Sequence, residues 1–329
     1  MPLRSQTHID APLTNISVAY IQQSSFIADK VFPIVPVTKQ SALFFKYRKE
    51  DWFSDQAKER AAGTESAGGD YSIDSEDAYF CRRYSFHKDV TEEDRANTDN
   101  PLDCDRDAAE FVTQKLLLKR ERDWAKKYFA SGVWGTEIKA DTDAAGSTPT
   151  GGANIFGWNS AKSDPIMDIA NSSDNMKGLT GYRPNTMVLG PKVLTALKNH
   201  PAIIERIKYT QRGVITLDLL ASMFEVQRIF VADSVSWNYD SLQDDKTEFL
   251  YGNHALLMYV APRAALKTPT AGYTFSWTGL EGCNTMQGNR IVRLPMDHLG
   301  LGTERIEGDM AYDMRVVSQD LGVFFKDVV

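Results

Sequence analysis

One uninterrupted helical stretch, residues 103–131, constrains the fold of this chain most. It contains neither proline nor glycine. Asp103 is a good N-cap residue, and the carboxylates in the next turn favour the positive end of the helix dipole. Ser131 and Gly132 offer the left-handed exit that ends many helices. At 1.5 Å per residue the predicted helix is about 40 Å long. We therefore expect a strut through the molecule, not the wall of a small pocket.

The predicted strut has an apolar side and a charged side. Residues that recur every three or four positions share one side of a helix. The side predicted to be buried holds Ala109, Val112, Leu116, Arg120, Trp124 and Tyr128. The side predicted to face solvent holds Lys115, Lys119, Glu121, Arg122 and Asp123. The strut therefore needs another element to pack against its apolar side.

Composition is that of an ordinary globular protein. Of the 329 residues, 42% are hydrophobic and 25% charged, which allows two or three compact units. The net charge of −7 argues against a dedicated nucleic-acid binder, because such proteins usually carry a basic excess. It does not exclude a protein that encloses nucleic acid without gripping it. Neither a signal peptide nor a membrane span is predicted, so we expect a soluble protein made in a cytoplasm.

The N-terminal part predicts two extended elements. Residues 1–41 are interpreted as an arm, because Pro33 and Pro36 prevent a helix from continuing after the apolar residues that begin at Phe26. Residues 42–90 predict a long two-stranded hairpin, because apolar and polar residues alternate on both sides of the Gly-rich segment 55–74. A lone hairpin is marginal in water. Its apolar residues are therefore expected to pack on a neighbouring copy of the chain.

The remainder predicts an α/β unit followed by strands. Asp164 and Pro165 are a strong helix start. The unit at 182–237 alternates strands and helices: strands at 186–189 and 226–231, and helices that begin at Pro191, Pro201 and Thr216. Such a pattern indicates a small mixed sheet. Further strands are predicted at 255–260, 289–294, 310–317 and 323–328, and the last three are expected to form the sheet that packs against the strut. The fold class is therefore α+β.

No motif for chemistry is found, so no catalytic, cofactor-binding or metal-binding residue is assigned. The five histidines are scattered, and an acid–base or metal role would need a partner at close spacing. The three cysteines form no metal or disulfide pattern. The triplet Asp103, Asp105 and Asp107 lacks the glycine and glutamate of a calcium loop. These absences favour a structural protein over an enzyme.

The order of the elements resembles the tailed-phage major capsid protein, with the Hong Kong 97 type fold. The resemblance rests on residues 84–94 (YSFHKDVTEED), 186–198 (TMVLGPKVLTALK), 213–224 (GVITLDLLASMF) and 226–234 (VQRIFVADS). It covers most of residues 30–329. It implies an N-terminal arm (1–41), an extended hairpin loop (42–90), a peripheral domain (91–180) with a spine helix (103–131), an axial α/β domain (181–262) and closing strands of the peripheral domain (263–329).

The resemblance also implies a function. Family members are structural proteins, not enzymes, that self-assemble through hexamers and pentamers into an icosahedral shell around double-stranded DNA. The implied location is the virion capsid, after assembly in the host cytoplasm. The implied partners are other copies of the chain, a scaffolding protein, a portal, a decoration protein and DNA contacted non-specifically, with no membrane and no cofactor.

Two details of the family are only partly matched. The stretch before Phe26 is too short for a built-in scaffold, so a separate scaffolding protein or none is expected. Some members cross-link a lysine to an asparagine between subunits. Lys46 and Lys58 lie on the predicted loop, but no complete set of cross-linking residues can be assigned.

Three alternatives stay open at this point. The chain could be the shell protein of an encapsulin-like nanocompartment, which loads a cargo enzyme instead of DNA. It could be a hydrolase of unrecognised type with its site in the 182–260 unit. It could also be another virion component, such as a tail or decoration protein, although these rarely need a strut.

Overall fold

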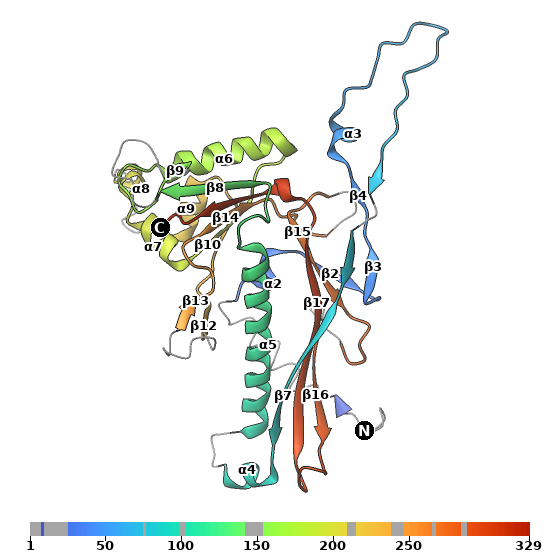
Figure 1. The fold of residues 1–329 in the computed structure, drawn as a ribbon, viewed down its shortest axis with the longest axis vertical. Helices are drawn as coiled ribbons and strands as arrows, with labels where there is room; N and C mark the ends of the chain where they lie inside the picture. Colours follow the sequence, from blue (N-terminus) through green and yellow to red (C-terminus); the bar gives the residue numbers. More distant parts are fainter. Residues whose placement is uncertain are drawn as a thin grey trace.

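Two six-stranded sheets and one long helix that joins them form most of the described part of the molecule (Figure 1). The computed structural model describes residues 8–9, 26–74, 77–98, 103–141, 154–208, 215–237, 247–264, 268–283 and 288–329. The long helix and the strands beside it form a narrow lower part, an α/β body lies at its upper end, and an arm projects beyond the body (Figure 1). The predicted α+β class is confirmed.

The long helix is α5, Cys104–Tyr128. Asp103 caps it as predicted, since its carboxylate accepts the N–H groups of Asp105 and Arg106 at 3.1 and 3.2 Å. All six residues of the predicted apolar side are buried. The helix ends three residues earlier than predicted, because Phe129 leaves helical geometry and is itself buried. The prediction that Glu121 faces solvent is wrong: its side chain is fully buried.

The first sheet packs along α5, from Val112 and Leu116 up to Asp123 and Lys127. Its strand order is β1 (His8–Ile9), β16 (Asn289–Pro295), β17 (Glu304–Val316), β15 (Gly272–Trp277) and β2 (Ile34–Val37), with β7 (Arg82–Val90) also paired to β17. Gly308 on β17 is required for this packing, because a Cβ there would lie 2.6 Å from Val112 and 2.8 Å from Leu116. Residues 82–90 therefore belong to this sheet and not to the hairpin in which the sequence placed them.

The second sheet forms the centre of the α/β body. Its order is β11 (Arg228–Val231), β10 (Thr186–Leu189), β14 (Ala255–Met258), β18 (Gly322–Lys326), β8 (Thr136–Asp141) and β9 (Ile155–Phe156). Parallel and antiparallel pairs occur together, which confirms the predicted mixed sheet. The prediction that 323–328 shares a sheet with 289–294 and 310–317 is wrong, although Phe324 does pack against Phe129 at the end of the predicted strut, with ring centroids 5.6 Å apart. The apolar run Val323-Phe-Phe is buried on both sides, as in a central strand covered on both faces.

Helices cover the second sheet and short elements complete the chain. The covering helices are α6 (Pro165–Thr180), α7 (Pro191–Lys198), α8 (Pro201–Ile207) and α9 (Leu217–Met223). Their predicted starts at Asp164, Pro191, Pro201 and Thr216 are confirmed. The short elements are α2 (Ala28–Val31), β3 (Ser41–Leu43), β4 (Lys46–Tyr47), α3 (Lys49–Phe53), β5 (Ile73–Asp74), β6 (Ala78–Phe80), α4 (Glu92–Asn97), β12 (Val235–Trp237), β13 (Thr247–Phe249) and η2 (Gln319–Leu321).

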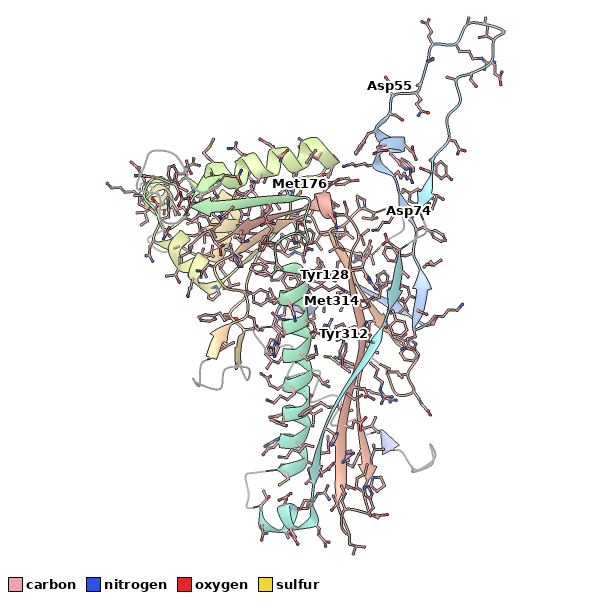
Figure 2. All side chains as sticks on the ribbon, in the orientation of Figure 1. Asp55, Asp74, Tyr128, Met176, Tyr312 and Met314 are labelled. Carbon is pink, nitrogen blue, oxygen red and sulfur yellow. The ribbon has the colours of Figure 1, made fainter. Side chains whose placement is uncertain are left out.

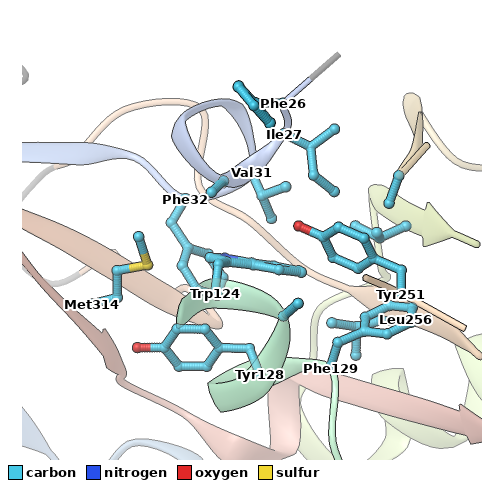
Figure 3. Close-up of a cluster of buried hydrophobic side chains, with 14 of the residues drawn as sticks. Phe26, Ile27, Val31, Phe32, Trp124, Tyr128, Phe129, Tyr251, Leu256 and Met314 are labelled. Atoms are coloured by element: carbon cyan, nitrogen blue, oxygen red, sulfur yellow. The ribbon is translucent and has the colours of Figure 1, made fainter. Parts of the chain in front are cut away.

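An aromatic core lies where the upper end of α5 meets the body (Figure 3). Trp124 is fully buried and lies 5.9 Å from the ring of Phe32 and 5.7 Å from that of Tyr251. Phe26, Ile27, Val31 and Phe32 of the N-terminal segment are all buried here. The predicted extended conformation is wrong for Ala28–Val31, which is a helical turn. The remainder of the predicted arm before Phe26 lies outside the described residues, apart from β1.

Candidate functional site: the projecting arm

The described residues hold no group of three or more His, Cys, Asp or Glu side chains that could bind a metal. None of their helices is long and apolar enough to cross a bilayer. The sequence assigned no catalytic or metal-binding role to its five histidines and three cysteines. Of the cysteines, Cys81 is buried, and burial raises the pKa of its thiol to about 12, which makes it a poor nucleophile.

Ser163 and His200 form a serine–histidine pair in the body, with 2.9 Å between Oγ and Nε2. His200 Nδ1 accepts the backbone N–H of Ala202 at 3.2 Å, so the ring proton of a neutral imidazole lies on Nε2. That nitrogen faces the carbonyl oxygen of Ser160 at 3.1 Å, and the Ser163 hydroxyl donates to the same oxygen at 2.8 Å. Nε2 therefore has no lone pair free to take a proton from Ser163. His200 caps α8, and the hydrolase hypothesis gains no support from the pair.

The arm, residues 41–80, is the feature of the molecule that its own fold leaves uncovered (Figures 1 and 2). At its base, β3 pairs with β6 in antiparallel register. Tyr79 on β6 is buried and stacks on Phe275 of the first sheet, with ring centroids 4.5 Å apart and an interplanar angle of 14°. Phe44 lies 5.4 Å from the same ring. The base is thus fixed to the sheet by aromatic packing.

The middle of the arm holds three aromatic side chains that contact one another. The rings of Tyr47, Trp52 and Tyr71 have centroids 6.0–6.3 Å apart. Asp51 accepts the backbone N–H of Ser72 at 2.7 Å and its hydroxyl at 2.6 Å, and these hydrogen bonds lower the pKa of Asp51. The hydrogen bonds and ring contacts hold α3 against the returning chain, so the aromatic groups are presented in a defined arrangement.

Seven large apolar side chains of the arm face solvent. Phe45 is 69% exposed, Phe53 62% and Trp52 56%, and the further exposed apolar residues of the arm are Leu43, Tyr71, Ile73 and Phe80. Single exposed apolar residues are normal, but a contiguous group marks an interaction surface. The arm is therefore the surface of this chain that most needs a partner.

The arm differs from the predicted hairpin in its pairing. Strands pair only at two short places, β3 with β6 and β4 with β5. Residues 54–72 contain no strand, because Gly, Ala, Ser and charged residues provide few cross-strand apolar pairs. The segment leaves the body beyond Asp55 and returns at Asp74 (Figure 2). The predicted long two-stranded ladder is wrong, whereas the predicted polar tip is confirmed.

The two lysines singled out for cross-linking lie in different surroundings. Lys46 forms an ion pair with Asp77 near the base of the arm. Lys58 lies on the exposed tip. A role for Trp52, Phe53 and Tyr71 was not predicted from the sequence. Two adjacent aromatic residues inside a polar segment were the signal that could have identified them.

Comparison with known proteins gives matches in sequence. Residues 152–265 match the family described as phage major capsid protein E. The chain is 26% identical over 285 residues to the major capsid protein of Burkholderia phage BcepMu, covering 82% of this chain and 84% of that protein. It is 27% identical over 326 residues to the major capsid protein of Pseudomonas phage JBD67, covering 98% and 97%.

Comparison with solved structures gives matches in fold. A phage-related protein from Bordetella bronchiseptica superposes with a TM-score of 0.72 at 21% identity over 98% of both chains. The capsid of cyanophage P-SCSP1u gives 0.59 at 13% identity, covering 92% of this chain and 88% of that one. An encapsulin from Synechococcus elongatus gives 0.53 at 12% identity, covering 92% and 86%. The sequence matches and the shared fold together confirm the predicted resemblance: this chain is similar, over nearly its whole length, to the major capsid proteins of tailed phages.

Proposed function

We propose that the chain is the subunit of an icosahedral shell that encloses double-stranded DNA, and that it assembles itself through hexamers and pentamers. One observation carries the proposal: the arm holds a group of exposed aromatic side chains that the subunit itself does not cover. Burying such groups on a neighbouring copy would stabilise the assembly by about 25 cal/mol per Å² of apolar surface removed from water. Each copy both gives and receives an arm, so a ring of copies can close.

The position of the arm supports a role between subunits. Its base is anchored through Tyr79 and Phe275, and Lys49 on α3 pairs with Asp320 of the body. Beyond these anchors, residues 54–72 extend away from the body (Figure 2). An arm fixed at its base reaches a neighbour in one direction, which a regular ring requires.

The division into an extended loop, a peripheral domain (91–180 and 263–329) and an axial domain (181–262) is part of this proposal, with the predicted loop (42–90) shortened because residues 82–90 pair with β17. So are the virion location, assembly in the host cytoplasm, and partnership with a scaffolding protein, a portal and a decoration protein. The family's structural, non-catalytic role supports the proposal that the chain is no enzyme.

An encapsulin-like shell is the second candidate, because an encapsulin shares the fold. The sequence matches favour a phage shell, since both curated relatives cited above are phage major capsid proteins. The contents of purified particles separate the two candidates: double-stranded DNA is expected, and a protein cargo in its place would favour the encapsulin.

The test of assembly changes the apolar character of the arm at two positions. The double variant Trp52→Ser, Tyr71→Ser should remain a folded subunit but form no closed shells in electron micrographs. The matched control, Trp52→Phe with Tyr71→Phe, keeps aromatic area at the same positions and should still assemble. Closed shells of normal size from the serine variant would reject the role given to the arm.

A further inference from the structure

The solvent-facing side of α5 carries positive charge along its upper part. The exposed residues between 111 and 126 on this helix are Phe111, Lys115, Lys119, Arg122 and Lys126. The four cations recur at intervals of four, three and four residues, so they lie on one stripe of the helix. At 1.5 Å per residue the stripe is about 16 Å long. Between Lys115 and Lys126, the acidic side chain of α5 that reaches solvent is Asp123, which is partly exposed and forms an ion pair with Lys119.

Strand β7 extends this stripe toward the lower end of the molecule. Phe86 on β7 and Phe111 on α5 are 38% and 44% exposed, and their ring centroids lie 5.9 Å apart. Two ammonium groups flank this aromatic pair: Lys88 Nζ lies 6.0 Å and Lys115 Nζ 5.2 Å from the Phe111 ring. Cations at such distances are attracted to the ring face. The Phe111 ring therefore favours the position of two cations beside the aromatic pair.

We define the basic ridge as Lys88, Lys115, Lys119, Arg122 and Lys126. Lys119 forms an ion pair with Asp123 and lies 5.3 Å from the ring of Tyr84. The other four cations form no ion pair with a carboxylate of the described residues. The whole chain carries a net charge of −7, so the ridge is a locally positive surface on an acidic protein.

We propose that the basic ridge binds the phosphate backbone of double-stranded DNA and is the face that the subunit turns toward the packaged molecule. This inference rests on the proposed function, because it takes the content of the shell to be DNA. A linear array of positive side chains suits a polyanion such as DNA. Contacts to phosphates alone do not depend on the base sequence of the DNA. It also explains how a net acidic subunit can hold DNA at one face while its other faces repel it.

An acidic protein segment is the competing partner of such a surface. Protein interfaces usually contain a buried apolar or aromatic core within a polar rim. The ridge offers only Phe86 and Phe111, and the ammonium groups of Lys88 and Lys115 lie 6.0 and 5.2 Å from the Phe111 ring. The phosphate backbone, which needs charge and no apolar core, therefore fits the ridge better.

The test measures how the affinity of the purified subunit for a short DNA duplex depends on salt. Each phosphate neutralised contributes about −0.9 to the slope of log K against log salt, so contact through five cations predicts a slope of about −4.5. The triple variant Lys115→Gln, Arg122→Gln, Lys126→Gln should reduce the magnitude of that slope by about 2.7. The matched control, Lys177→Gln, Lys192→Gln, Lys198→Gln, makes the same charge change at exposed lysines of the body and should keep the wild-type slope.

Several outcomes would overturn the inference. One is an equal reduction of the slope in both triple variants, which would mean that net charge alone governs binding. Another is wild-type protein that binds a polyglutamate peptide through the ridge but not the duplex, which would assign the ridge to an acidic protein. The conservative variant Lys115→Arg, Lys126→Arg keeps both positive charges and should bind the duplex as the wild type does. This result distinguishes lost charge from damaged folding.

Electron micrographs separate this inference from the proposed function. The ridge variant should still form closed shells, because its changes lie away from the arm. If wild-type protein forms no shells, the proposed function fails whatever the DNA result. If shells form and the ridge variant binds DNA as wild type does, only the ridge inference fails.

Discussion

The hydroxyl group of Tyr251 donates a hydrogen bond to the carboxylate of Glu121, which lies 130 positions earlier in the chain. The same carboxylate accepts the backbone N–H groups of Ile27 at 3.1 Å and Ala28 at 2.8 Å. Both side chains are buried. Burial raises the pKa of Glu121, and these hydrogen bonds act in the opposite direction by favouring its charged form. One carboxylate thus joins the long helix, the body and the N-terminal segment.

Glu121→Gln tests this junction. An amide offers one acceptor oxygen where the carboxylate offers two, and its NH₂ group can donate only to the hydroxyls of Tyr251 and Ser234. The hydrogen bonds that Ile27, Ala28 and Tyr251 donate to a charged carboxylate are therefore weakened or lost, at a cost of about 1–3 kcal/mol. We expect a lower urea midpoint and faster amide exchange at Ile27 and Ala28. The control Asp123→Asn removes a partly exposed carboxylate on the same helix and should cost less than about 1 kcal/mol. Unchanged exchange at both amides would show that Glu121 does not hold the segment.

Trp124→Ala tests the aromatic core in Figure 3. The side chain is fully buried against Phe32, Tyr128, Phe129 and Tyr251, so its removal should lower the free energy of unfolding by about 3–5 kcal/mol. Trp52→Ala is the matched control, because it removes the same side chain from the exposed arm and should change that free energy by roughly 0.5 kcal/mol or less. Denaturant unfolding of both variants measures the difference. A similar loss of unfolding free energy in both variants would mean that Trp124 is not part of the stabilising core.

The long helix shows how far sequence patterns reach. Its start at Asp103 and its buried positions from Ala109 to Tyr128 follow from local capping and periodicity, and both were predicted. Glu121 was misplaced because its burial depends on Tyr251 and on the backbone of residues 27–28, which no local pattern reveals. The position of the helix in the sequence and its buried side are local properties, whereas the residues that pack around it are set by the tertiary fold.

Strand partners and the arm show the same limit. Most of residues 82–90 and 323–328 form strands, as predicted. Their predicted strand partners were wrong, because 82–90 pairs with β17 and 323–325 pairs with β14. Alternation of apolar residues identifies a strand and does not identify its partner. For the candidate site, the sequence predicted a projecting arm with a polar tip, and it missed the aromatic group of Trp52 and Tyr71, which forms only when α3 meets the returning chain.

Asp168→Asn gives a prediction that depends on pH. Burial raises the pKa of Asp168 to about 6, although the indole N–H of Trp158 donates to its carboxylate at 3.1 Å. A carboxyl group with a raised folded-state pKa binds its proton more tightly when folded, so stability falls as pH rises between about 4 and 6. Asparagine keeps an acceptor for Trp158 without charge.

The asparagine variant should therefore be more stable than wild type at neutral pH, by on the order of 1 kcal/mol because partial solvent exposure weakens the effect. The difference should disappear below about pH 4, where the wild-type carboxyl is protonated in both states. Thermal unfolding across this range measures it. Asp174→Asn, an exposed change on the same helix, should show no such pH dependence, and a parallel shift in both variants would contradict the explanation.

Deletion of residues 58–70, with a short Gly-Ser closure, separates the reach of the arm from the stability of the subunit. The described hydrogen bonds of this segment are local ones such as Thr64 to Ala61 and Arg60 to Thr64, so the body and the base of the arm should keep their unfolding midpoint. A shortened arm cannot extend as far over a neighbour, so closed shells should be absent from micrographs while the subunit stays soluble. The control replaces the same residues with a Gly-Ser segment of equal length, which keeps the reach and removes the side chains. Normal shells from the deletion would mean that the tip is dispensable, and normal shells from the control alone would mean that its length matters more than its sequence.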